Sequence, residues 1–136
     1  MKEKLSCILL IDDDKATNWL HQILINKLCC SDQVIVKGNG REALDYLLSP
    51  EPKPRIDLIL LDLNMPVMDG WEFLARYKEA DFDQKDTSVL TVLTSSLNPD
   101  DEKKIRVLGG SHGYHQKPLD LDSLEGLLRL YFPERF

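Results

Sequence analysis

The stretch that decides the fold is residues 56–70, which read Ile56-Asp57-Leu58-Ile59-Leu60-Leu61-Asp62-Leu63-Asn64-Met65-Pro66-Val67-Met68-Asp69-Gly70. It begins as a short, almost unbroken apolar run of the length expected for a strand buried on both faces. The run ends on the carboxylate of Asp62 and then breaks into a turn rich in Pro, Asp and Gly. Ligands bind at the carboxyl ends of strands in open α/β sheets, so Asp62 stands where chemistry is expected.

A second stretch, near the N-terminus, has the same pattern. The apolar run Leu5–Ile11 leads directly into Asp12, Asp13 and Asp14. Taken alone, an Asp triplet is typical of a solvated turn in which one acid caps the following helix, and Asp14 is the expected cap. The repetition of a buried strand that ends in carboxylates favours a functional role for Asp12 and Asp13 instead.

Strand and helix patterns alternate along the rest of the chain. Short β-branched or apolar runs predict strands at 34–36, 89–93 and 114–116, and apolar residues at helical spacing predict helices at 16–28, 43–48, 70–80, 98–109 and 121–131. The proline-rich residues 49–54 and the acidic residues 81–86 are expected to be surface loops. Five such alternations imply parallel β-α-β units with right-handed crossovers and helices on both faces of one sheet.

Apolar and aromatic positions predict how the helices pack. The helix over 16–28 is expected to bury one face, made of Ala16, Trp19, Leu20, Ile23, Leu24 and Leu28. The aromatic side chains expected to pack in the core or on helix faces are Trp19, Trp71, Phe73 and Tyr77. His21 and His112 are expected at the surface. His115 is expected to be a neutral, hydrogen-bonded, half-buried strand residue, with a pH-sensitive contact under the last helix as the alternative.

Composition limits the class of protein. The 136 residues fit one domain, and 43% hydrophobic with 29% charged residues is typical of a soluble globular protein. A net charge of −6 argues against a nucleic-acid surface, and no apolar run is long enough to span a membrane, so we expect a cytoplasmic protein. Cys7, Cys29 and Cys30 are expected to be buried or half-buried thiols with no metal or redox role.

Polar residues follow four of the predicted strands. They are Asp12 and Asp13, Asp62, Thr94, and Lys117. Because the carboxyl ends of parallel strands share one edge of the sheet, these groups are expected to converge. Carboxylates that repel one another are compatible with a hard divalent cation such as Mg²⁺, and Lys117 suits a phosphoryl oxygen. A carboxylate nucleophile, a metal, a lysine and a hydroxyl are the parts of phosphoryl transfer to aspartate.

These residues carry a family resemblance over nearly the whole chain. The motifs, in order, are Asp12-Asp13, Asp62 with Asn64-Met65-Pro66-Val67-Met68-Asp69-Gly70, Thr94-Ser95, and Gly113-Tyr114 with Lys117-Pro118. This ordered set resembles the signature of response-regulator receiver domains in two-component signalling, and it is similar to the chemotaxis-type single-domain regulators. The resemblance implies an α/β, flavodoxin-like (βα)5 fold: a doubly wound, five-stranded parallel sheet of strand order 2-1-3-4-5.

The resemblance also implies a role for each matching position. Asp62 would accept the phosphoryl group from phosphohistidine on a sensor histidine kinase or a histidine phosphotransfer domain. Mg²⁺, or Mn²⁺, would be held by Asp12, Asp13, Asp62 and the backbone carbonyl of Asn64. The phosphoryl-binding and switch residues would be Thr94, Ser95, Tyr114 and Lys117, and Pro118 is a candidate for a cis peptide bond. Phosphorylation would then shift the population of a two-state, partner-binding face.

Two positions are expected to set the lifetime of the phosphorylated form. Asn64 and Ser96 each stand two residues beyond a site residue and flank the path of an attacking water in the family. Neither is an acid that could act as a general base. We therefore predict slow to intermediate autodephosphorylation, which a half-life of seconds would contradict.

Three other functions are alternatives to this interpretation. Gly38-Asn39-Gly40-Arg41-Glu42-Ala43 matches a dinucleotide-binding fingerprint, but it follows the second predicted strand and the chain is too short for both halves of that fold. An aspartate-nucleophile phosphatase would need an acid where Asn64 stands. A pseudo-receiver that binds partners without phosphorylation is the third alternative, and nothing in the residues favours it.

The sequence is therefore interpreted as a single receiver domain over residues 1–136, with no output domain. It is expected to be a signalling phosphoacceptor, not an enzyme with a separate substrate. Its output would pass to an unknown downstream protein, or the phosphoryl group would pass onward to a histidine. No direct contact with nucleic acid or membrane is expected.

Overall fold

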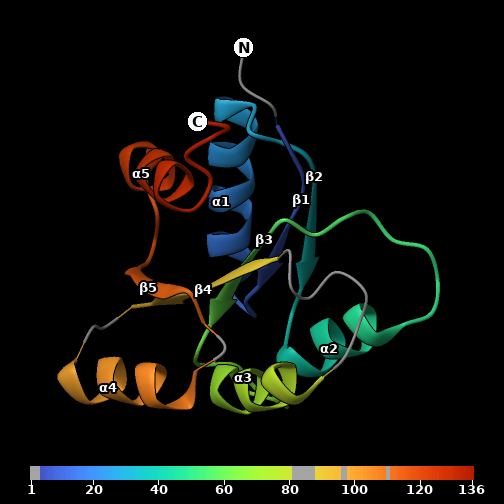
Figure 1. The fold of residues 1–136 in the computed structure, drawn as a ribbon, viewed down its shortest axis with the longest axis vertical. Helices are drawn as coiled ribbons and strands as arrows, with labels where there is room; N and C mark the ends of the chain where they lie inside the picture. The colour runs from blue at the N-terminus through green and yellow to red at the C-terminus, as the bar shows by residue number, and fades with distance from the viewer. Residues whose placement is uncertain (1–3, 81–87, 96–97, 110) are drawn as a thin grey trace.

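The computed structural model describes residues 4–80, 88–95, 98–109 and 111–136 (Figure 1). Strands and helices alternate along these ranges in the order β1 (Leu5–Ile11), α1 (Lys15–Leu28), β2 (Ser31–Lys37), α2 (Gly40–Leu48), β3 (Leu58–Asp62), α3 (Gly70–Glu79), β4 (Val89–Thr94), α4 (Pro99–Leu108), β5 (Gly113–Gln116) and α5 (Leu121–Tyr131). Each predicted element is present, and β2 is longer than predicted. The loop predicted over 81–86 lies outside the described residues.

The five strands form one parallel sheet in the order β2-β1-β3-β4-β5. This is the flavodoxin-like order that the family resemblance implied. The chain moves outward from β1 to β2 and then returns to β3 on the other side of β1. The carboxyl ends of β1 and β3 are therefore neighbours at the point where the winding reverses, which is where such sheets bind their ligands.

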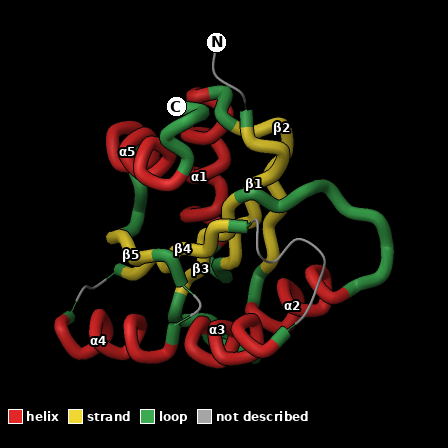
Figure 2. The backbone as a smooth tube through the Cα atoms, viewed as in Figure 1, coloured by secondary structure: helices red, strands yellow, loops and turns green. Residues whose placement is uncertain are grey.

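Helices cover both faces of the sheet. Figure 2 shows α1 and α5 on one side and α2, α3 and α4 on the other. Alternate residues of β1 serve the two layers: Leu9 and Ile11 pack with α2 and α3, whereas Ile8 and Leu10 pack with α1 and α5. β3 is buried along its whole length, which explains its unbroken apolar sequence.

The packing of α1 differs from the prediction. Trp19 is 66% exposed and Ile23 is 39% exposed, although both were assigned to the buried face. The buried residues of α1 are Asn18, His21, Leu24 and Ile25. Hydrophobic periodicity misplaced this face because the polar side chains Asn18 and His21 of α1 are buried and hydrogen-bond the Asp12 carbonyl and the Leu119 N–H.

The three cysteines are free thiols, and one prediction about them was wrong. Cys7 and Cys30 are buried, and burial is the main cause that raises the pKa of each thiol to about 11. Cys29 is exposed, and it terminates α1 in a left-handed conformation with φ of 50°. Within the part of the chain that the structure describes, no helix has the length and apolar character needed to cross a bilayer.

Val67 adopts a backbone conformation that is unfavourable for a β-branched residue. Its φ is 68°, its side chain is 79% exposed, and the Met68 N–H donates to the Pro66 carbonyl across it at 2.8 Å. Asparagine tolerates this left-handed backbone region better than valine does. We expect Val67→Asn to raise the free energy of unfolding by about 1 kcal/mol in urea denaturation. Val107→Asn, at an exposed position within α4, should lower it slightly. Equal effects of the two substitutions would contradict the prediction.

Candidate functional site

Three carboxylates meet where β1 and β3 end. One oxygen from each of Asp12, Asp13 and Asp62 lies within 4.8 Å of the others. Asp12 and Asp62 are buried, at 5% and 3% exposure, whereas Asp13 is exposed. Asp12 and Asp13, which follow β1, and Asp62, which ends β3, are therefore held together at the carboxyl edge of the sheet, as the strand-end pattern predicted.

Lys117 lies between two of these acids. Its ammonium Nζ is 3.0 Å from Asp12 Oδ2 and 3.2 Å from Asp62 Oδ1. Burial lowers the pKa of Lys117, but the hydrogen bonds and charges of Asp12 and Asp62 outweigh it and hold the pKa above its ordinary value. Burial raises the pKa of Asp62, the charge of Asp12 raises it further, and Lys117 opposes both. Lys117 thus offsets part of the repulsion among the acids.

The donor set fits a hard divalent cation. The three carboxylates and one ammonium carry a formal charge of −2, and all available ligand atoms of the acids are oxygens. Mg²⁺ prefers such carboxylates together with water. Asn64, the fourth predicted metal residue, is exposed next to the acids, and its backbone N–H donates to the Asp62 carboxylate.

Local hydrogen bonds build the two acidic turns. Asp12 Oδ1 accepts from the Asp14 N–H at 2.9 Å, and Asp14 caps α1 by accepting from the Ala16 N–H at 3.0 Å. After β3, the Gly70 N–H donates to the Leu63 carbonyl at 2.9 Å. These bonds fold the chain back directly after β1 and β3, which sets the backbone positions of Asp12 and Asp62 at the ends of the two strands.

The other predicted residues lie along β4, β5 and the loops that follow them. Thr94 is buried at the end of β4, and its carbonyl accepts from the Lys117 N–H at 2.9 Å; Ser95 follows it and is exposed. The Lys117–Pro118 peptide bond is cis, as the resemblance implied. Ser96 lies outside the described residues.

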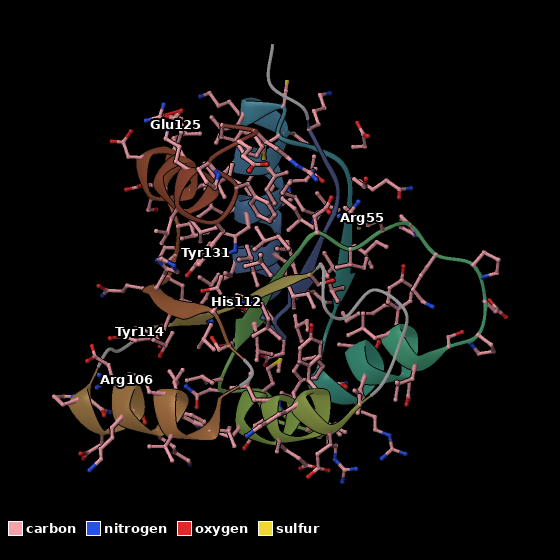
Figure 3. The ribbon with its side chains drawn as sticks, viewed as in Figure 1. Arg55, Arg106, His112, Tyr114, Glu125 and Tyr131 are labelled. Carbon is pink, nitrogen blue, oxygen red and sulfur yellow. The ribbon has the colours of Figure 1, made fainter. Side chains whose placement is uncertain are left out.

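Tyr114 is half-buried and lies toward α4. Figure 3 shows it close to Arg106, and the Tyr114 hydroxyl hydrogen-bonds Glu102 of the same helix. Burial is the first cause that raises its pKa, followed by Glu102. The side chain therefore connects β5 to α4 on the face predicted to switch.

His115 is a half-buried, hydrogen-bonded side chain, in agreement with the prediction. Its Nε2 is 3.1 Å from the Tyr131 hydroxyl of α5, and the two rings meet edge to face with centroids 5.8 Å apart. The same hydroxyl is 3.4 Å from Thr91 Oγ1. Tyr131, visible in Figure 3 beside β5, thus links α5 to both β4 and β5.

The buried His21 and the half-buried His115 predict a pH dependence of stability. Burial lowers the pKa of His21 and of His115 from 6.5, so the unfolded chain binds more protons as the pH falls through that value. The contribution of both rings is present above about pH 6.5 and is lost below it. His115→Gln should therefore make the free energy of unfolding fall less steeply between about pH 7 and pH 5. Urea denaturation across this range measures the slopes, and identical slopes would contradict the prediction.

Sequence reasoning missed two residues that support the site. Neither Asn18 nor His21 is among the site residues that the sequence predicts, and the prediction of His21 at the surface is wrong: the two residues are 5% and 3% exposed. Asn18 Nδ2 donates to the Asp12 carbonyl at 2.8 Å, and His21 Nε2 accepts from the Leu119 N–H at 3.1 Å. The sequence signal that could have indicated this role is the pair of polar residues three positions apart on one helix face, just after the acidic turn.

Comparisons with known proteins agree with this architecture. The family model described as "Response regulator receiver domain" matches residues 8–129. The two-component response regulator 24 of Arabidopsis thaliana is 32% identical over 120 residues, which cover 88% of this chain and 79% of that protein.

Solved structures give the same result. A two-component response regulator from Cytophaga hutchinsonii superposes with a TM-score of 0.80 at 29% identity, covering 96% of this chain and 99% of that one. The phosphorylated cyanobacterial phytochrome response regulator RcpA gives a TM-score of 0.77 at 30% identity, with 97% of each chain covered. By its sequence, its fold and the arrangement of its acidic strand ends, this chain belongs to the response regulator receiver domain family.

Proposed function

We propose that this protein takes a phosphoryl group from phosphohistidine onto Asp62 and thereby changes a partner-binding face. The observation that carries the proposal is the contact of Lys117 Nζ with both Asp62 and Asp12 beside the exposed Asp13. A buried carboxylate, a fixed cation and further oxygen ligands stand together at one sheet edge. The donor would be a sensor histidine kinase or a histidine phosphotransfer domain, and residues 1–136 would act as one receiver unit.

The proposed chemistry is an in-line displacement at phosphorus. An oxygen of Asp62 forms the new O–P bond, the N–P bond of the phosphohistidine breaks, and the imidazole retains its electron pair and is then protonated. Lys117 is close enough to Asp62 to hold a phosphoryl oxygen with its ammonium. Mg²⁺ or Mn²⁺, held by Asp12, Asp13, Asp62 and the Asn64 carbonyl, would neutralise charge on the transferred group.

The proposed switch begins at Thr94 and Ser95. Thr94 lies at the end of β4, beside the Lys117 segment that its carbonyl anchors. A phosphoryl group that recruits the Thr94 hydroxyl would favour one packing of Tyr114 against α4 over another. The face formed by α4, β5 and α5 would then present a different surface to a downstream protein. The proposed output needs no contact with nucleic acid or membrane.

Asn64 is proposed to slow hydrolysis of the phosphorylated form. Its side chain is exposed beside the acids and is an amide, so it cannot serve as a general base for water. We expect a half-life longer than seconds, and decay of the adduct measured by mass provides the test.

The experiment that tests the proposal uses acetyl phosphate as a chemical phosphoryl donor. Intact mass is followed with and without Mg²⁺, and the modified residue is located by peptide mass after the acyl phosphate is trapped by reduction. One metal-dependent adduct on Asp62 is expected. Absence of any adduct on the folded protein would favour the pseudo-receiver alternative, and continuous release of phosphate from unrelated phosphoesters would favour a phosphatase.

A further inference from the structure

The segment that carries Lys117 is fastened at both ends. The Lys117 N–H donates to the Thr94 carbonyl at 2.9 Å, which ties its beginning to β4. Pro118 has no N–H. The Leu119 N–H, two residues later, donates to Nε2 of His21 at 3.1 Å, which ties its end to α1. The His21 bond therefore joins this segment to a helix that is 98 residues away in the sequence.

His21 is suited to accept this hydrogen bond. The ring is 3% exposed and lies among the apolar side chains Leu24, Leu60, Leu119 and Leu124. Burial lowers its pKa, which favours the neutral ring and leaves one ring nitrogen able to accept. An aliphatic residue at this position would leave the buried Leu119 N–H without its acceptor.

The same helix also holds the other partner of the ion pair. Asn18, one turn before His21 on α1, donates from Nδ2 to the Asp12 carbonyl at 2.8 Å. Asp12 and Lys117 are the two residues joined by the 3.0 Å ion pair. α1 thus fixes the backbone on both sides of this pair, at Asp12 through Asn18 and after Lys117 through His21.

We propose that His21 is a positioning residue for phosphoryl transfer: it holds the Leu119 amide and so keeps the Lys117 ammonium between Asp12 and Asp62. The inference rests on the proposed function. It assigns His21 a role in the rate of phosphoryl uptake in addition to its contribution to folding. Because a small misplacement of a catalytic group lowers rates strongly, the loss of this one acceptor should be measurable.

Two substitutions separate the acceptor from the bulk of the ring. His21→Leu fills similar space without an acceptor, whereas His21→Gln keeps a neutral acceptor with a reach close to that of Nε2. Ile25→Val is the matched control, because Ile25 is fully buried on the same helix and packs in the same apolar cluster. The rate of phosphorylation by acetyl phosphate is measured at saturating Mg²⁺. Circular dichroism under the same conditions checks that each variant is folded. Mg²⁺ affinity is measured separately by calorimetry.

We expect His21→Leu to lower the phosphorylation rate about tenfold, and His21→Gln to restore it to within about threefold of wild type. Ile25→Val should leave the rate unchanged. Mg²⁺ affinity should not fall in His21→Leu, because the three carboxylates remain in place. If His21→Leu does not fold, His21→Asn replaces it, since its acceptor is one bond shorter than that of Gln and should show the same loss.

The outcomes separate the two proposals. No adduct on the wild-type protein would overturn the proposed function, and the role of His21 with it. A wild-type adduct together with full-rate His21→Leu would overturn only the role of His21. Equal rates for the Leu and Gln variants, or a parallel loss of Mg²⁺ affinity, would also overturn it, because either result would indicate general loosening of the site.

Discussion

Replacing Asp62 by asparagine is expected to abolish phosphoryl uptake while the protein stays folded. The side chains have the same shape, but the amide oxygen is a far weaker nucleophile than a carboxylate. The variant should also be more stable than wild type without metal, because burial and the neighbouring Asp12 disfavour the charge of Asp62 and so hold its pKa above the ordinary value. Intact mass after incubation with acetyl phosphate and Mg²⁺ measures uptake, and urea denaturation measures stability.

Asp69→Asn is the matched control for this substitution. This substitution changes the net charge by the same amount, at the end of the loop that follows Asp62. Asparagine can replace Asp69 as the cap of α3, because either side chain can accept from the Glu72 N–H. The control should be phosphorylated at a rate close to that of wild type. Added Mg²⁺ should also stabilise wild type more than Asp62→Asn, since the substitution removes one of the proposed carboxylate ligands. An adduct on Asp62→Asn would place the modification on another residue and contradict the proposed chemistry.

Gly70→Ala is expected to cause the largest loss of stability. A Cβ at Gly70 would lie 2.5 Å from the Asp62 carbonyl oxygen and 2.6 Å from the Leu63 Cα. Both are backbone atoms, so the strand end or the start of α3 must move. We expect the free energy of unfolding to fall by about 3 kcal/mol. Uptake of the phosphoryl group should also slow, because the displaced backbone is that of Asp62, the proposed acceptor.

Gly126→Ala provides the opposite result with the same chemical change. Gly126 lies within α5, and apart from its chain neighbours and the backbone of its own helix, no atom of the described residues lies within 4 Å of an added Cβ there. Alanine is the better helix former, so stability should rise by up to about 1 kcal/mol with no change in phosphorylation. Thermal or urea denaturation measures the stability of both variants relative to wild type. A Gly70→Ala protein as stable as Gly126→Ala would contradict the close backbone contact.

Most of the fold could be predicted because local signals agreed with the global arrangement. The helix that begins at Pro99 illustrates this: its cap Asn98, its proline and its first acids were all readable, and Asn98 accepts from the Asp101 N–H at 2.8 Å as a cap should. Strand alternation then required a parallel sheet, and its carboxyl edge required the carboxylates of Asp12 and Asp62 to meet.

Helix α1 shows where periodicity is insufficient. Its apolar spacing placed Trp19 on the buried face, but the structure buries Asn18 and His21 there and leaves Trp19 66% exposed. The reason is that Asn18 and His21 each have a backbone partner at a distant loop, Asp12 and Leu119 respectively. Such a partner is invisible to a scale that ranks residues only by hydrophobicity, because the favourable hydrogen bond exists only after the chain has folded.

Asp57 and Asp62 show the difference between what the sequence predicts and what only the tertiary structure decides. The sequence by itself predicted that the apolar run containing Asp57 and ending at Asp62 is a buried strand of a parallel sheet, and that Asp62 lies at the carboxyl edge of that sheet. Only the tertiary structure decided their electrostatic environments. Asp57 is 1% exposed, but it accepts from the Ser6 N–H and faces Arg55 at 3.2 Å and Arg135 at 3.7 Å, so its charge is compensated for a structural purpose. Asp62 has Lys117 and two further acids around it. The charges that surround a carboxylate come from segments far away in the sequence, and folding alone brings them together.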